Sequence, residues 1–365
     1  MSMRPAAGMP GRLAILGSGI ALALSHSGTV ALAEDGLARG DTSGKRIAFS
    51  NSYAGSSFRQ VMVKSWQEVA AQARKDRLIG LSPVVSANNS VAEQATHIQD
   101  MILQGYDAIV ILAGSDTALN GVVKDACNAG IVVLSLASVV TEDCAYNVNY
   151  DWSAHGKAEI AYIAERLKGK GNLLEIRGIL GDSTDKDISD GIHAAARNHP
   201  GLKIVKTVYG QWTAAVSQKE VTLALPALPQ IDAVVDQGGD GYGAALAFKA
   251  AGRALPIIIM GNRQDELALW KREHEANGYE TFSISATPTV SQVGFWVAQQ
   301  ILAGKKVPKR IEVPLLSIDQ DSLDDWLRTM PEGGAATPFY TQELVAGIID
   351  ANINHTPLPP TPAPR

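Results

Sequence analysis

The amino-acid sequence predicts an α/β protein built from two doubly wound parallel sheets that follow one another along the chain. Short apolar runs alternate with stretches of helical periodicity, an order typical of βαβ units. This alternation breaks after residue 137 and restarts at residue 154. The chain has 365 residues, which is more than a single hydrophobic core usually spans. We therefore expect two lobes, each with its own sheet.

In the first half, compact apolar runs give the strands and amphipathic runs give the helices. The run "VAEQATHIQDMILQG", for example, has apolar residues at helical spacing and ends at Gly105, a common helix terminator. The expected strands are 47–51, 81–87, 108–114 and 131–137, and the expected helices are 58–76, 91–105 and 118–130.

The second half repeats this order and then changes character. The expected helices are 154–169, 187–201, 214–228, 241–252, 264–275 and 289–304, and the expected strands are 171–178, 203–210, 231–237, 255–261 and 280–287. The tail adds a strand-like run at 310–318 and helices at 321–330 and 341–353. Its end, 355–365, is rich in Pro, which favours a disordered or extended segment.

The amino terminus has the layout of a secretory signal peptide. Two arginines and an apolar run at 13–24 precede a small-residue cleavage site that ends at Ala33. The alternative is an uncleaved anchor helix, which the short apolar run and the polar residues 25–27 disfavour. We expect a signal peptide over 1–33, export to the periplasm, and a flexible polar linker over 34–44.

Composition narrows the class of protein. Apolar residues make up 46% and charged residues 19% of the chain, and the net charge is −5, values ordinary for a soluble globular protein. There is no basic stripe, so nucleic-acid binding is disfavoured. The two cysteines, Cys127 and Cys144, are either a disulfide in an exported chain or two separate buried thiols. No metal site is expected, because the histidines are scattered and thiols are few.

Several stretches in a fixed serial order resemble a known family. They are "IAFSNSYAGSSFRQVMVKSW", "GYDAIVILAGSDTALNGVVKDACNAGIVVLSL", "NYDWSAHGKAEIAYIAERLKGKGNLLEIRGILGDS", "IDAVVDQGGDGYGAALAFKAAG" and "PTVSQVGFWVAQQILAGKKV". The likeness covers about residues 45–313 and is to the periplasmic sugar-binding proteins of ribose-type ABC importers, which share the type I two-lobed fold of lactose-repressor effector domains. It is the order of the segments, rather than one motif, that makes the resemblance specific.

The resemblance implies a division into lobes joined by a multi-strand hinge. Residues 45–148 plus 286–314 would form the amino-terminal lobe, 149–285 the carboxyl-terminal lobe, and 315–365 an extension that wraps back over a lobe. The chain would cross between lobes near 148–151, 285–287 and 313–317. The hinge residues would be Asn149, Tyr150, Asp151, Ser285 and Ala286.

Open parallel sheets bind ligands at the carboxyl ends of their strands, so the loops there supply the candidate ligand-binding residues. A polar ligand needs flat apolar faces and fixed hydrogen-bonding groups. In the first lobe the candidates are Tyr53, Ser56, Phe58, Arg59, Ser115, Asp116 and Ser138. Around the second lobe they are Trp152, Asp182, Lys186, Gln237, Asp240, Asn262, Arg263 and Thr287.

Each of the more specific assignments has a structural alternative. Phe58 is either a stacking surface or a core residue at a helix start, and Arg59 is either a ligand donor or a solvated residue. The second reading of Arg59 is weakened because a helix N-terminus disfavours a cation. Asp116 is either a ligand group or the N-cap of the next helix. Trp152 either walls the cleft or packs beneath it.

Several positions depart from the family pattern. Lys186 corresponds best to the family's cleft arginine, with surface exposure as the alternative. Arg263 stands where many sugar binders carry an aspartate. Ala137 and Ser138 stand where the family often has a charged pair. With these changes we still expect a small polar ligand. Whether that ligand is neutral or anionic stays open.

The sequence therefore predicts a periplasmic solute-binding protein that captures a sugar, polyol or sugar derivative by hinge closure. The resemblance further implies a monomer without cofactor that delivers its ligand to an ABC permease. An enzyme is disfavoured, since no G-x-S-x-G elbow and no metal-binding spacing is present. A DNA-binding regulator is disfavoured because it would need a helix-turn-helix before residue 47, where the sequence has the layout of a signal peptide instead. A sensor ectodomain that docks on a chemoreceptor or kinase stays open.

Overall fold

The structure is a computed structural model that describes residues 36–55 and 57–364. The predicted signal peptide and Ser56 lie outside the described residues. In the described part, no helix is both long and apolar enough to cross a membrane.

The first sheet, called here the amino-terminal sheet, has the strand order β11-β5-β4-β3-β1-β2. All its pairings are parallel, and Phe49 in the middle of β1 pairs with Val84 on one side and Val110 on the other. Its strands are β1 (Ile47–Asn51), β2 (Val84–Ser86), β3 (Ala108–Leu112), β4 (Val132–Leu136), β5 (Tyr146–Asn149) and β11 (Arg310–Glu312). The order reverses at β1, so the loops after β1 and β3 flank the point where doubly wound sheets bind ligands.

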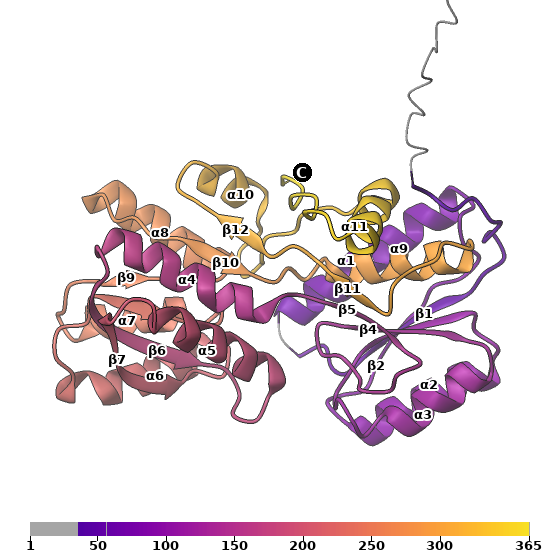
Figure 1. Ribbon diagram of the computed structural model, residues 1–365, viewed down its shortest axis with the longest axis horizontal. Helices are drawn as coiled ribbons and strands as arrows, with labels where there is room; N and C mark the ends of the chain where they lie inside the picture. The colour runs from indigo at the N-terminus through magenta and orange to yellow at the C-terminus, as the bar shows by residue number, and fades with distance from the viewer. Residues whose placement is uncertain (1–35, 56, 365) are drawn as a thin grey trace, which may run out of the picture. The chain divides into compact units, whose positions relative to one another are not determined.

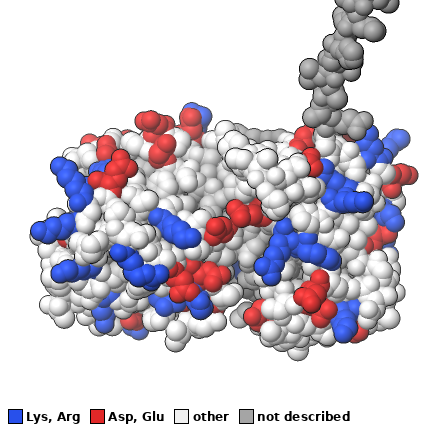
Figure 2. Space-filling model, in the orientation of Figure 1, with Lys and Arg blue, Asp and Glu red and all other residues white. Residues whose placement is uncertain are grey.

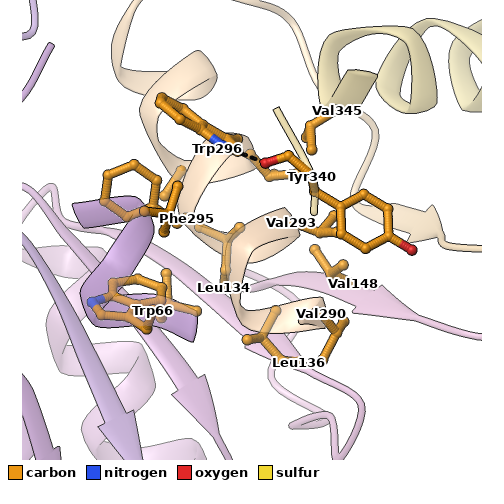
Figure 3. Packing of buried hydrophobic residues seen from close by; sticks show 14 of the residues in the cluster. Trp66, Leu134, Leu136, Val148, Val290, Val293, Phe295, Trp296, Tyr340 and Val345 are labelled. Carbon is orange, nitrogen blue, oxygen red and sulfur yellow. Dashed lines mark hydrogen bonds between the residues drawn. The ribbon is translucent and has the colours of Figure 1, made fainter. Parts of the chain in front are cut away.

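Helices cover both faces of this sheet (Figure 1). One face carries α1 (Ser57–Lys75), α9 (Val290–Leu302) and α11 (Gln342–Asn354), and the other carries α2 (Val91–Leu103) and α3 (Asn120–Asn128). Figure 3 shows the centre of the first layer, where Trp66 of α1 meets Phe295 edge to face at 5.3 Å. Because α9 and α11 come from late in the sequence, this core closes only when distant segments meet.

The second sheet, called here the carboxyl-terminal sheet, has the order β7-β6-β8-β9 and is also parallel. Its strands are β6 (Lys170–Arg177), β7 (Gly201–Tyr209), β8 (Ala233–Val235) and β9 (Ile257–Ile258). Helices α4 (Trp152–Arg166) and α5 (Ser183–Ala196) cover one face, while α6 (Ala214–Ala224), α7 (Gly241–Ala250) and α8 (Gln264–Asn277) lie on the other side. The order reverses at β6, which makes the loops after β6 and β8 the second candidate site.

The tail divides differently from the prediction. The single strand expected at 310–318 is two strands separated at Pro314: β11 joins the amino-terminal sheet, and β12 (Leu316–Ile318) pairs antiparallel with β10 (Ser283–Ser285). Helix α10 (Leu323–Thr329) follows and contacts α8. Proline has no backbone N–H and cannot continue a ladder, which explains the break.

The structure corrects the expected flexible linker and decides between the two alternatives for the cysteines. The segment expected as a flexible linker is held against α9, because Ala38 N–H donates to Gln300 Oε1 and Gly40 N–H to the Ala303 carbonyl. Its far end is also buried, with Thr42 only 3% exposed. The sulfur atoms of Cys127 and Cys144 are bonded in a disulfide, with the two Cα atoms 6.3 Å apart.

Positive and negative side chains are mixed on the face of the molecule that Figure 2 shows. Figure 2 shows Lys and Arg interspersed with Asp and Glu over the described residues of this face. On this face, opposite charges lie close to one another and are not separated by sign.

Candidate ligand-binding site

The loop after β1 brings together an aromatic ring and a guanidinium. Asn51, fully buried, donates from Nδ2 to the Tyr53 carbonyl at 2.7 Å and to Ser86 Oγ at 3.2 Å, which fixes the path of the loop. Arg59, in the first turn of α1, then holds its guanidinium 5.3 Å from the centre of the Tyr53 ring. Cation and ring attract at this distance, so the two predicted site residues form one unit.

Arg59 is partly buried. Burial lowers the pKa of its guanidinium, while Tyr53 and the carboxylate of Asp182 act in the opposite direction. Asp182 belongs to the loop after β6, so a residue of the second sheet stabilises a cation beside the first sheet. Phe58, next to Arg59, is half-buried and packs against the core that contains Trp66, so the core alternative accounts for at least part of its ring.

The loops after β3 and β4 bond to each other. Asp116 is exposed, and its carbonyl accepts from Thr141 N–H, while the Ser138 carbonyl accepts from Ala113 N–H. Ser115 Oγ accepts from Ala118 N–H at 3.1 Å. The N-cap of α3 is Leu119 and not Asp116, so the capping alternative for Asp116 is wrong.

The loops after β6 and β8 share a buried polar junction. The Gly178 N–H donates both to Gln237 Oε1 at 3.0 Å and to Asp185 Oδ1 at 2.9 Å. Gln237 in turn donates from Nε2 to Asp185. Arg177 completes the junction with a bidentate ion pair to Asp185: Nε donates to Oδ1 at 3.1 Å, and Nη2 donates to Oδ2 at 2.6 Å. This fixes the two loops that flank the reversal in strand order.

Trp212, in the loop after β7, lies over this junction and was not predicted from the sequence. A Cβ atom placed on Gly178 would stand 2.4 Å from two carbons of the indole ring. Trp212 adopts a left-handed backbone conformation, with φ of 54°, which a bulky residue rarely does without compensating contacts. The sequence signal that could have identified Trp212 is its position: an aromatic residue in a short loop at the carboxyl end of a strand.

Arg263 connects Trp212 to the third loop of this sheet. Its Nη2 donates to the Trp212 carbonyl at 3.0 Å, and its guanidinium lies so close to Gly239 that a Cβ there would stand 2.5 Å from it. The fully buried Asp240 accepts from Thr213 N–H at 2.9 Å. Burial raises the pKa of Asp240 to about 8, and Glu266 adds to that shift, while the charge of Arg263 opposes it.

The crossing segments are joined by hydrogen bonds between predicted hinge residues and predicted ligand-binding residues. Asn262 donates to the Ala286 carbonyl at 2.8 Å, and Thr287 N–H donates to the Tyr150 hydroxyl at 3.3 Å. Trp152 packs on Tyr150 with ring centres 5.0 Å apart and donates from Nε1 to Asn149 Oδ1. Trp152 is therefore part of the packing around the crossings, the second of its two alternatives.

The remaining predicted residues have local partners. Asp182 is the N-cap of α5 and accepts from Thr184 N–H at 2.7 Å, while Asp151 caps α4 and accepts from Ala154 N–H at 2.8 Å. Lys186 is exposed and pairs with Asp190 one turn along α5. Ser285 Oγ would meet a Cβ on Gly238 at 2.7 Å, which places it against the Gly-rich turn after β8.

The same lobe contains carboxylates that serve its structure. Glu266 accepts from the N–H groups of Gly239 and Gly261, and Asp236 accepts from Gly238 N–H at 2.6 Å. Burial raises the pKa of both groups, as expected where charge is desolvated. Within the described residues, no group of His, Cys, Asp and Glu side chains is arranged to hold a metal ion.

The loops at these strand ends carry the kinds of side chain that a small hydroxylated molecule requires. Trp212 carries a flat apolar ring, and Arg59 and Arg263 carry guanidinium donors, whereas the buried Asn262 amide is already bonded to the Ala286 carbonyl. These groups stand at the carboxyl ends of strands from two doubly wound sheets. Fold and site together define a two-sheet α/β binding protein.

Residues 47–306 match the family described as periplasmic binding protein domain. The chain belongs to this family, in its ribose-type branch of sugar-binding proteins. It is 31% identical over 243 residues to the xylitol-binding protein of Mycolicibacterium smegmatis, a match that covers 66% of this chain and 68% of that one. It is 26% identical over 259 residues to the ribose import binding protein RbsB of Bacillus subtilis, covering 70% and 81%.

Among solved structures, the chain is similar to an ABC transporter solute binding protein from Thermobispora bispora. The TM-score is 0.78 and the sequence identity 32%, over 88% of this chain and 99% of that one. A periplasmic solute binding protein from Actinobacillus succinogenes with bound D-allose has a TM-score of 0.67 at 21% identity, over 77% and 100%. These likenesses confirm the type I fold predicted from the serial order of the segments.

Proposed function

We propose that this protein captures a small, hydroxyl-rich ligand, a sugar, polyol or sugar derivative, in the periplasm and delivers it to an ABC import permease. The observation that carries this proposal is the group formed by Trp212, Gly178 and Arg263 at the strand ends of the second sheet. It joins a stacking face to fixed donors. The names of the xylitol-binding and ribose-binding relatives support the ligand class.

Capture proceeds by hinge closure of two lobes, 45–148 plus 286–314 and 149–285. The negative charge of Asp182, beside the second sheet, acts on the guanidinium of Arg59, beside the first. A ligand that contacts both lobes binds the closed arrangement better than the open one and so shifts the population toward it. The protein acts as a monomer, after export by a cleavable leader, and performs no chemistry on the ligand.

The experiment is a thermal-shift screen of the purified protein against sugars, polyols and sugar acids, followed by calorimetry on the hits. A neutral sugar or polyol that raises the melting temperature and binds at one site is the expected result. If only sugar acids bind, the ligand is anionic and not a neutral sugar or polyol. No binding by any of the three groups, or turnover of a bound sugar, would overturn the proposal.

A further inference from the structure

The C-terminal extension contacts both sheets and all three crossings between them. We define the C-terminal clasp as residues 331–364, the chain that follows α10. Before it, α10 is anchored beside the carboxyl-terminal sheet, since Trp326 and Leu323 are buried in one cluster with Trp270 and Leu267 of α8. The clasp therefore starts from a fixed point on that side.

The first part of the clasp pairs with the loop that carries Arg263. The Ala336 N–H donates to the Asn262 carbonyl at 2.9 Å, and the Gln264 N–H donates to the Gly334 carbonyl at 3.0 Å. Ala335 and Arg263 stand opposite each other in an antiparallel bridge. The backbone around Arg263 is thus fixed from outside its own sheet.

The middle of the clasp is buried in the core of the amino-terminal sheet. Figure 3 shows Tyr340 among Val148, Val290 and Val293, with Trp296 Nε1 donating to its carbonyl at 3.0 Å. The Tyr340 N–H donates to Gln292 Oε1 at 2.9 Å. Helix α11 follows and contributes Val345, Ile348 and Ile349 to the same core.

The end of the clasp returns over the crossings. Leu358 packs against the amino-terminal core, and Thr361 Oγ1 donates to the Leu315 carbonyl at 3.3 Å, within the third crossing. The Tyr340 hydroxyl lies beside Thr361 and beside Thr287 of the second crossing. The last residues reach Trp326 and Asp325 of α10, with which they line a common groove, and Figure 1 marks the C-terminus between α10 and α11.

From these contacts we infer that residues 331–364 are a positioning element of the binding site: they hold the Asn262–Arg263 loop in place and tie the lobes together beyond the three crossings. The inference rests on the proposed function, because the two lobes that the clasp ties together are the ones between which the proposed ligand binds. The extended Pro-rich end suits this role, since proline restricts the backbone in advance and loses little entropy when it docks.

If the clasp favours the binding arrangement, its loss lowers the fraction of molecules competent to bind and weakens the apparent affinity by that factor. The main variant is a chain that ends at His355, which keeps α11 and removes only the returning end. The second variant is Thr361→Val, which removes one hydroxyl at nearly constant volume. Thr356→Val is the matched control, because Thr356 is an exposed residue of the same tail.

Two readouts are used. Hydrogen exchange of the ligand-free protein reports the amides of 285–289 and 313–317, and calorimetry with the sugar or polyol found in the screen reports affinity. We expect faster exchange at both crossings in the shortened chain and in Thr361→Val, with a dissociation constant about three- to thirtyfold higher for the shortened chain. Thr356→Val should match the parent protein in both.

Unchanged exchange at both crossings, with affinity within about twofold of the parent, would overturn the inference. If the shortened chain fails to fold, Thr361→Val decides by the same two readouts. If the parent protein binds no sugar or polyol, the proposed function fails, while exchange at the crossings still tests whether the clasp ties them.

Discussion

The indole ring of Trp212 rests on the Cα atom of Gly178, so that a Cβ at this glycine would stand 2.4 Å from the ring. The two residues come from loops after neighbouring strands, β7 and β6. Because the contact leaves no room for a side chain, glycine at this position determines where the aromatic face lies.

Gly178→Ala should displace the Trp212 ring and weaken ligand binding about tenfold, the loss expected when a stacking contact worth about 1–2 kcal/mol is disturbed. Gly121→Ala is the control, since nothing stands within 4 Å of its added Cβ in helix α3. Calorimetry gives the affinity of both. Equal affinities in the two variants would remove Trp212 from the site.

Arg59→Ala should weaken binding by about ten- to a hundredfold with little change in melting temperature, because loss of a charged donor in a desolvated site costs about 1.5–3 kcal/mol. Lys186→Ala is the comparison. Lys186 is exposed and paired with Asp190, so that variant should bind within about twofold of the parent, as expected for a surface ion pair. If Lys186→Ala weakened binding more than Arg59→Ala did, Lys186 and not Arg59 would be the cation that contacts the ligand.

Arg263→Ala and Gly178→Ala should not have additive effects on binding. Arg263 donates to the Trp212 carbonyl, and Gly178 supports the Trp212 ring, so both variants act on one aromatic residue. A double-mutant cycle measured by calorimetry should give a coupling of about 0.5–2 kcal/mol. A coupling of zero would show that Arg263 acts on the ligand independently of Trp212.

Asp240→Asn should flatten the dependence of stability on pH. Burial raises the pKa of Asp240 from 3.8 to about 8, so between these values the folded protein holds a proton that the unfolded chain has released. Stability therefore falls as pH rises through this window, by up to about 1.4 kcal/mol per pH unit for one such group.

An amide resembles the protonated carboxyl in shape, so it should keep the fold while removing this dependence. Urea unfolding at pH 5, 6, 7 and 8 compares the two proteins. If the difference in unfolding free energy between Asp240→Asn and the parent is the same at all four values, Asp240 is ionised in the folded state.

Reduction of the Cys127–Cys144 disulfide should lower the free energy of unfolding by about 2–4 kcal/mol, since the bond closes a short loop in the unfolded chain. Ligand affinity should be unchanged, because the disulfide lies beside α3, away from the residues around Trp212. Unfolding is measured with and without reductant. The Cys127→Ser/Cys144→Ser variant is the control and should not respond to reductant.

Much of the fold could be predicted from local pattern. The strand expected at 47–51 is β1, and the helix expected at 91–105 is α2 with its end at Leu103. These elements follow from the spacing of apolar residues and from glycine at helix ends, which are properties of short segments. The restart of the alternation at residue 154 predicted a second sheet in series, and the solved relatives confirm the fold.

The site was predicted less completely. Arg59, Arg263 and Gln237 could be named because they follow predicted strands, but their partners could not. Trp212 follows β7, an edge strand of its sheet, and its place over Gly178 depends on how neighbouring loops pack.

The sequence by itself determined the elements, their order and the loops at which a ligand site can form. Only the tertiary structure decided which residues meet: Trp212 over Gly178, Arg263 with the Trp212 carbonyl, and Tyr340 in a core whose first strand is almost 300 residues earlier, at Ile47. The physical reason is the distance along the chain over which each kind of interaction acts. Hydrophobic period and turn chemistry act over a few residues, whereas packing joins residues far apart in the chain, and no short segment records its distant partner.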